Sequence, residues 1–421
     1  MTNWKRNLYA IWVAELLAMA GFSTSMPILP FYLQDIGVHD HDLLNFWVGI
    51  IQTGAAVSMG LIAPIWGRVA DSYGRKMMLL RSMYGGAVVI ALMGFVDAPW
   101  QLLVLRTIQG LLTGTVGAAT VLVAATVPES EQGFGMGLLQ TAVFVGASVG
   151  PMIGGIIADL IGNRFTFFVT AVMLAIAGII VTFLVEEEFV PPPRQSGSFW
   201  SKVFPDFGLV FRSNILLVLI MVGFVIQIGN AVVNPILPLY VEQLAKSSAM
   251  VATISGLILG IGAFTSAVSA AGIGKISFRL GYGRTLVICM IGAFVMQIPQ
   301  AFVTTIGQLF VLRLLTGFFL GGAVPSVSAL IARHTEKSVQ GSVYGINTSM
   351  SAAGMAIGPA IGAGVAVGLG YPATFLATAG VLAGGVVLAA LFGRIEPRGQ
   401  AVVSGAQVSS ATPGGRTATR R

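Results

Sequence analysis

Glu15 is the acidic residue of this sequence that is best placed for proton chemistry. It stands about seven residues into an apolar run that starts near Leu8. At a helical rise of about 1.5 Å per residue, this corresponds to a depth of roughly 10 Å in a membrane. A carboxyl group at that depth should face an internal cavity rather than lipid. There it could exchange a proton against a cationic substrate; a glutamate held only by an internal hydrogen bond is the alternative.

Arg106 is a second candidate for proton coupling. It lies inside another long apolar run, where a charged side chain costs roughly 2.5 to 3.5 kcal/mol on insertion scales and normally faces a cavity or a partner. Arg313 stands at the matching place in the second half of the chain, so a structural role common to both halves is the alternative. Glu15 lies near the inner third of its run and Arg106 near the outer third of its own. We therefore predict no direct ion pair between them.

Seven further residues could line a substrate cavity. They include methionines, whose flexible side chains suit an adaptable pocket, and side-chain amides that could form hydrogen bonds with a substrate. Simple helix packing is an alternative role for them. The candidate cavity residues are Met19, Phe22, Met26, Gln109, Gln227, Asn230 and Asn234.

Apolar helices must position all of these residues. The 421 residues are 55% hydrophobic and 9% charged, with a mean hydropathy of +0.87, whereas soluble domains carry roughly 25% charged residues. Stretches of about twenty apolar residues, each long enough to cross roughly 30 Å of hydrocarbon, recur along the chain. We predict an all-α membrane protein with twelve transmembrane helices, at residues 8–33, 44–66, 77–96, 100–124, 134–158, 164–185, 214–240, 250–274, 285–304, 307–331, 341–365 and 370–393.

The distribution of basic residues predicts the orientation of the chain. Most lysines and arginines fall in segments that lie on one side of the predicted spans, whereas the opposite loops hold only Arg164 and Lys246. Basic residues accumulate on the cytoplasmic side of membrane proteins, so we expect both termini in the cytoplasm. The net charge of +7 then needs no nucleic-acid partner.

The chain repeats itself at an offset of about 208 residues. Residues 26–32 match residues 234–240, and residues 150–154 match residues 358–362. Each repeat holds six predicted spans, so both enter the membrane in the same orientation. We predict two six-helix bundles, related by a pseudo-twofold axis along the membrane normal, around a central cavity. The predicted parts are an N-terminal bundle (1–185), a cytoplasmic linker (186–213), a C-terminal bundle (214–393) and a disordered basic cytoplasmic tail (394–421).

The segment between the second and third spans reads GRVADSYGRK at residues 67–76. Its terminal glycines permit a tight turn, and the segment resembles the signature loop of the major facilitator superfamily, with Ser72 where that family usually has arginine. In that family the aspartate helps to hold the cytoplasmic ends of the two bundles together. The resemblance implies a cytoplasmic gate formed by Gly67, Asp71, Gly74, Arg75 and Lys76; a loop that only sets topology is the alternative.

Two further motifs resemble those of exporters in the same superfamily. Residues 146–155 read GASVGPMIGG and fit the G-x-x-x-G-P-x-x-G-G pattern of its antiporter branch. Small residues four apart also allow ordinary close helix packing, which is the alternative. Residues 106–110 read RTIQG and resemble a motif whose arginine is implicated in proton coupling. The antiporter motif residues are Gly146, Gly150, Pro151, Gly154 and Gly155.

The resemblance extends over residues 4–393 and is closest to the drug:proton antiporter group with twelve spans. It implies a multi-pass protein of a bacterial inner membrane that exports drugs or other lipophilic small molecules in exchange for protons, by alternating access of the two bundles. Export of a sugar or another metabolite, or proton-coupled import of one, is the alternative on the same fold.

Other function classes lack the residues that they need. His39, His41 and His334 are the only histidines and fall on opposite sides of the predicted membrane, so a clustered metal or acid/base site is not expected. The sequence also has no G-x-x-x-x-G-K-[ST] nucleotide-binding loop. We therefore expect no enzyme activity, no metal and no cofactor, with the proton as coupling ion. The expected partners are a small-molecule substrate and the lipid bilayer, and the expected state is a monomer.

Overall fold

A computed structural model describes residues 4–187, 213–245, 250–335 and 340–395. Within these residues the regular structure is entirely helical. Most of the predicted linker and nearly all of the predicted C-terminal tail lie outside the described residues. Glu186 and Glu187, at the start of the predicted linker, are described and contact the first bundle. The carboxylate of Glu186 pairs with Arg6 at 2.5 Å, and its backbone exchanges two hydrogen bonds with the side chain of Asn7.

The first half contains eight α-helices and one short 3-10 helix among its described residues. They are α1 (Trp4–Thr24), α2 (Leu29–Asp35), α3 (His41–Tyr73), α4 (Arg75–Met93), α5 (Pro99–Leu112), α6 (Thr115–Thr126), η1 (Glu129–Glu131), α7 (Gln132–Ile161) and α8 (Asn163–Leu184).

The second half repeats this order with fewer breaks. Its described elements are α11 (Asn214–Val233), α12 (Leu237–Ala245), α13 (Val251–Leu280), α14 (Tyr282–Gln297), η2 (Pro299–Phe302), α15 (Ile306–Arg333), α16 (Gln340–Leu369) and α17 (Tyr371–Ile395).

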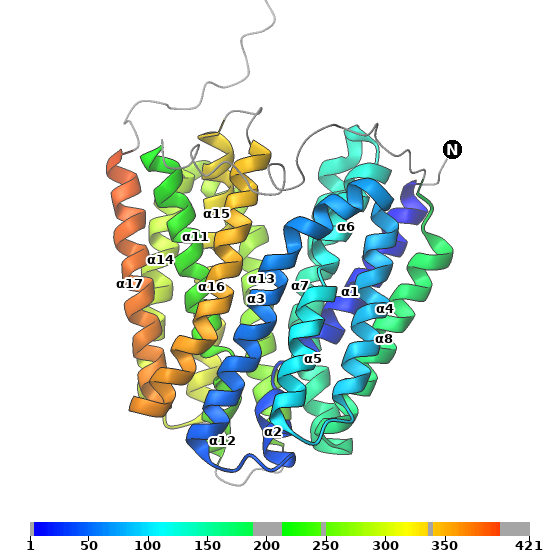
Figure 1. Ribbon diagram of the computed structural model, residues 1–421. Helices are drawn as coiled ribbons and strands as arrows, with labels where there is room; N and C mark the ends of the chain where they lie inside the picture. The colour runs from blue at the N-terminus through cyan, green and yellow to red at the C-terminus, as the bar shows by residue number, and fades with distance from the viewer. Residues whose placement is uncertain (1–3, 188–212, 246–249, 336–339, 396–421) are drawn as a thin grey trace, which may run out of the picture.

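These helices confirm the predicted number of spans. Eleven helices or helix pairs of the described chain are long and apolar enough to cross a membrane, and α1 with α2 makes a twelfth when this pair, bent by 49°, counts as one span. Pro27 and Pro30 stand at the bend, and proline interrupts the helical hydrogen-bond ladder. The chain is therefore a multi-pass membrane protein with two groups of helices side by side (Figure 1).

The segment at residues 67–76 differs from the predicted loop. The helix α3 continues to Tyr73, α4 begins at Arg75, and Gly74 alone makes the turn with φ of +96°. Glycine adopts this left-handed conformation without the steric cost that a side chain would add. Gly281 joins α13 to α14 in the same way, with φ of +88°. The turn thus needs one glycine, and Gly67 lies within α3.

The predicted repeat is visible in the packing of each bundle. Tyr32 stacks on Phe167 with ring centroids 4.8 Å apart, and Tyr240 stacks on Phe375 at 5.1 Å. Each tyrosine hydroxyl also donates to one backbone carbonyl near the end of the third span of its half and to one just after it. These residues are separated by the repeat offset, so the two halves have the same fold and form two six-helix bundles.

The two bundles meet through two helix pairs, α7 with α13 and α3 with α16. Ser148 donates to the carbonyl of Gly260 at 3.0 Å, and Thr53 donates to that of Ala356 at 2.9 Å. The helices α2 and α12 lie at one end of the molecule (Figure 1), which we call the α2–α12 side. There Gln34 of α2 donates to Glu242 of α12 at 3.2 Å. Contacts between the bundles therefore include the α2–α12 side.

Candidate functional site

Glu15 is fully buried in the middle of α1. Its Oε1 accepts a hydrogen bond from the hydroxyl of Thr115 at 3.0 Å, whereas its Oε2 is buried without a partner. Burial of an ionised carboxylate is costly unless the charge is paired, and neither ion pair of the described residues involves Glu15. The free oxygen is therefore a position where a proton can bind and leave.

Thr115 reaches Glu15 because the fourth span is broken there. The helix α5 ends at Leu112 and α6 begins at Thr115, with Gly114 between them at φ of +129°. A residue with a side chain would be strained in this conformation. Thr115, the first residue of α6, is itself buried. Thr115 is not among the predicted site residues, because a threonine after glycine in an apolar run gives no distinct signal.

Arg106 is buried on α5 and has polar neighbours rather than an acid. Its guanidinium group donates to the hydroxyl of Ser25 at 2.9 Å and to the side-chain oxygen of Gln109 at 3.1 Å. Ser25 is ten residues beyond Glu15, which corresponds to about 15 Å along a helix. The structure accordingly has no ion pair between Glu15 and Arg106, as the depths of the two residues predicted.

The second half lacks the equivalent site. Gly223 occupies the position that matches Glu15. The two hydrogen-bond partners of Arg106 are also replaced, Gln109 by Thr316 and Ser25 by Val233. Arg313 keeps its charge, but its Nε and one terminal nitrogen are buried without hydrogen-bond partners. A buried carboxyl group is therefore a feature of the first bundle alone at this position.

The glycine motif of the fifth span packs α7 against α1. A Cβ atom at Gly150 would overlap the carbonyl oxygen of Ala20, and one at Gly154 would overlap that of Thr24. At Gly146 a Cβ atom would come within 2.7 Å of the Met19 side chain. Helices approach this closely only where residues lack side chains.

The same motif also contacts the other bundle. A Cβ atom at Gly155 would overlap the carbonyl oxygen of Ala252 on α13, and one at Gly256 of α13 would overlap that of Pro151. The helix α7 thus touches α1 through Gly146, Gly150 and Gly154, and it touches α13 through Gly155. Close helix packing is the alternative to an exporter role for these residues. The structure shows such packing where the two bundles meet.

Two residues of the predicted cytoplasmic gate contact their own bundle. The backbone N–H groups of Arg75 and Lys76 donate to the carboxylate of Glu187 at 3.0 and 2.8 Å, and the Lys76 ammonium donates to the carbonyl of Thr182 at 2.9 Å. These N–H groups belong to the first turn of α4, where an anion is favourable. Gly67 and Asp71 lie on α3, but the side chain of Asp71 falls outside the described part of the chain.

The candidate cavity residues have mixed surroundings. Phe22 lies against Gly86 of α4 within the core of the first bundle, and Gln227 lies against Gly354 of α16. Asn230 and Asn234 are half-buried, whereas Met26 is exposed. Phe22 and Gln227 thus take part in helix packing, the alternative role for these residues.

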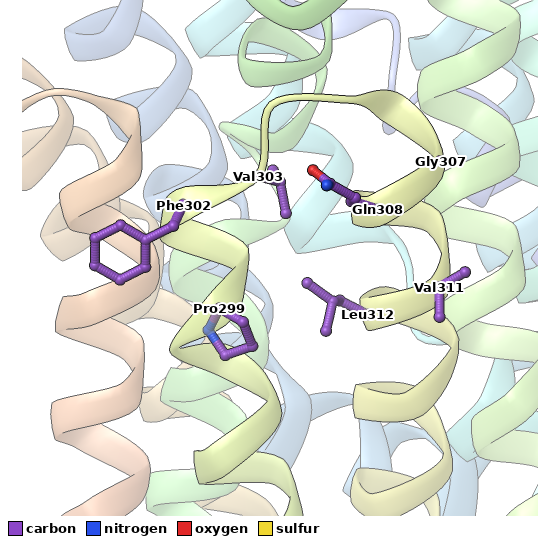
Figure 2. A pocket seen from close by; sticks show the side chains of 7 residues that line it. All are labelled: Pro299, Phe302, Val303, Gly307, Gln308, Val311 and Leu312. Carbon is purple, nitrogen blue, oxygen red and sulfur yellow. The ribbon is translucent and has the colours of Figure 1, made fainter.

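A separate pocket of about 620 Å³ lies between the end of α14, η2 and the start of α15 (Figure 2). Phe302 and Val311, at its edge, are 70% and 54% exposed, and Gln308 is its one polar side chain. None of the predicted site residues lines it. The full lining is Pro299, Phe302, Val303, Gly307, Gln308, Val311 and Leu312.

Comparison with known proteins finds a family and relatives that match most of the chain. The family model described as Major Facilitator Superfamily matches residues 11–306 and 256–418. The chain is 37% identical over 380 residues to a protein of Proteus mirabilis named "Multidrug resistance protein MdtG", with 90% of this chain and 94% of the relative covered. It is 38% identical to the protein of that name from Dickeya zeae, with 90% and 92% covered.

A solved structure of the nucleoside transporter NupG (D323A mutant) has the same fold. It superposes with a TM-score of 0.78 at 14% sequence identity and covers 93% of this chain and 100% of its own. The twelve helical spans, the internal repeat, the family match and the identity to curated relatives agree with one another. The chain belongs to the Major Facilitator Superfamily.

Proposed function

We propose that this protein exports drugs or other lipophilic small molecules in exchange for protons, with Glu15 as the proton carrier. The observation that carries this proposal is the fully buried carboxyl group with one hydrogen bond and one free oxygen. The names of the relatives support the class of substrate. Intramembrane acidic residues commonly mark proton pathways in transporters.

The proposed cycle needs one proton site that both faces can reach in turn. With its carboxylate ionised, Glu15 favours a cationic substrate that arrives from the cytoplasm. After the bundles rock to the opposite state, a proton from the outside binds Oε2, neutralises the charge and weakens the hold on the substrate. Return of the bundles then releases the proton to the cytoplasm. The substrate leaves and the proton enters once per cycle, which is alternating access.

Contacts between the bundles on the α2–α12 side must break in this cycle. Asp159 of α7 accepts hydrogen bonds from the backbone N–H groups of Ala252 and Thr253, in the first turn of α13, at 3.3 and 2.7 Å. Such an anion also complements the positive end of the α13 dipole. We propose that this contact holds the α2–α12 side together and that this side faces outward. In that arrangement both termini are cytoplasmic, and the protein works as a monomer in a bacterial inner membrane with no cofactor.

Proton movement in proteoliposomes tests the function. The vesicles enclose a pH-sensitive dye, and ethidium, a lipophilic cation, or a neutral drug is added while internal pH is followed. Glu15→Gln should abolish the substrate-dependent proton flux. The matched control is Glu131→Gln, because Glu131 is exposed in η1, and it should retain the flux. If the native protein moved substrate without protons, antiport would be excluded; if Glu15→Gln kept the flux, another group would carry the proton.

A further inference from the structure

The break in the fourth span exposes carbonyl groups that a continuous helix would satisfy. Within an α-helix the carbonyl of Leu111 would accept from the N–H of Thr115, but the chain turns away at Gly114. Instead, the indole N–H of Trp66 on α3 donates to the Leu111 carbonyl at 2.6 Å. A side chain of another helix thus satisfies one carbonyl group at the break.

Arg81 lies over the Trp66 ring. Its guanidinium carbon lies 3.5 Å from the ring centroid, a close cation–π contact. Its Nε and one terminal nitrogen are buried without hydrogen-bond partners. Arg81 belongs to α4, so three helices of the first bundle meet at this indole. The indole therefore has a fixed position relative to the break.

The second bundle provides an internal comparison. Its tenth span, α15, is continuous from Ile306 to Arg333, although Gly321 occupies the position of Gly114. Ile273 and Ile288 stand where the first half has Trp66 and Arg81. Gly223 stands at the position that matches the buried Glu15. The first bundle thus has all four features: the tryptophan, the arginine, the helix break and the carboxyl group. The second bundle has none of them at the matching positions.

Few other charges can act on Glu15. The helices that pack closely on α1 are α6, α7 and α8. Their described charged residues are Asp159, near the end of α7, and Arg164, near the start of α8, whereas Glu15 lies in the middle of α1. Lys5 and Arg6 stand at the other end of α1. Among the described residues, the hydroxyl of Thr115 is the hydrogen-bond partner of the carboxyl group, so its position matters to the proton.

We propose that Trp66 and Arg81 are positioning residues for proton exchange. The Trp66 indole caps the Leu111 carbonyl, Arg81 fixes the indole, and the resulting break keeps the Thr115 hydroxyl on Glu15. Because a hydroxyl donor favours the ionised carboxyl group, this chain of contacts sets the pH at which Glu15 exchanges its proton. The inference rests on the proposed role of Glu15 as proton carrier.

The test measures protonation of Glu15 directly. Dicyclohexylcarbodiimide reacts with protonated carboxyl groups in apolar surroundings, and mass spectrometry of the digested protein gives the fraction of Glu15 modified as a function of pH. Trp66→Phe keeps the aromatic ring under Arg81 and removes only the N–H donor. Thr115→Val removes the donor to Glu15. Trp100→Phe is the matched control, because Trp100 is 59% exposed at the start of α5.

Trp66→Phe and Thr115→Val should each move the midpoint of modification to higher pH, by about one unit, a roughly tenfold change in proton binding. The double variant should shift no further than Thr115→Val alone, and Trp100→Phe should match the native protein. A shift in Thr115→Val without one in Trp66→Phe would overturn the proposal, and so would additive shifts. If Trp66→Phe does not fold, Arg81→Gln takes its place with the same expected shift. Since labelling reports protonation and not transport, this result is independent of whether Glu15 couples export.

Discussion

Gly150→Ala tests whether the glycine motif brings α7 and α1 into close contact, as the structure shows. The added Cβ would overlap the Ala20 carbonyl oxygen and lie 2.7 Å from the Cβ of Ser23, where 3.4 to 4 Å is ordinary contact. Overpacking of this kind costs about 1 to 3 kcal/mol. Gly137→Ala, on the same helix, meets no atom within 4 Å, and replacing a helical glycine by alanine should stabilise by about 1 kcal/mol.

The difference between these two variants isolates the packing cost. The assay heats each purified protein in detergent and measures the temperature at which half remains monodisperse by size-exclusion chromatography. Gly150→Ala should lose both thermal stability and transport, whereas Gly137→Ala should be at least as stable as the native protein. Equal stability of the two variants, with transport intact, would refute the claim that α7 and α1 touch through their backbones at Gly150.

Two other contacts give similar predictions. Asp159→Ala should favour separation of the bundles on the α2–α12 side, because a hydrogen bond to a charged group contributes about 1.5 to 3 kcal/mol; spin labels at positions 39 and 243 would show longer distances. Asp97→Asn, which changes an exposed ion pair within the first bundle, should leave those distances unchanged, and an equal effect of both variants would contradict a specific latch. Arg106→Lys should reduce transport, since an ammonium group cannot reproduce the planar fork of guanidinium donors to two acceptors. Native transport rates in this variant would show that the hydrogen-bond pair is dispensable.

Much of the fold is predictable from the sequence because the membrane imposes it. Long apolar runs must be helical in lipid, so the spans follow from hydrophobicity, and the repeat follows from matched motifs such as residues 26–32 and 234–240. The burial of Glu15 was also predictable, since its depth in the first span leaves no path to water along lipid. The glycine pattern at residues 146–155 predicted close helix contact, although not which helices would meet.

Other features depend on contacts that hydrophobicity does not encode. The extension of α3 to Tyr73 is polar in its last turns, so an apolar pattern ends before the helix does. The break at Gly114 resembles any glycine in a span, and glycine is frequent in transmembrane helices; its counterpart Gly321 lies in a continuous helix. The break at Gly114 has the indole of Trp66 on another helix as a hydrogen-bond donor, a tertiary contact that has no local signature.

Substrate accumulation driven by a pH gradient shows whether Glu15 couples proton entry to export. Proteoliposomes with an acidic interior are mixed with ethidium, and accumulation is compared with exchange of labelled for unlabelled ethidium at equal pH on both sides. Glu15→Gln should lose the accumulation driven by the gradient and retain the exchange at saturating ethidium, because rocking of the bundles persists without proton coupling even though the neutral side chain holds the cation less tightly. Gradient-driven accumulation by Glu15→Gln at the native level would show that a group other than Glu15 carries the proton.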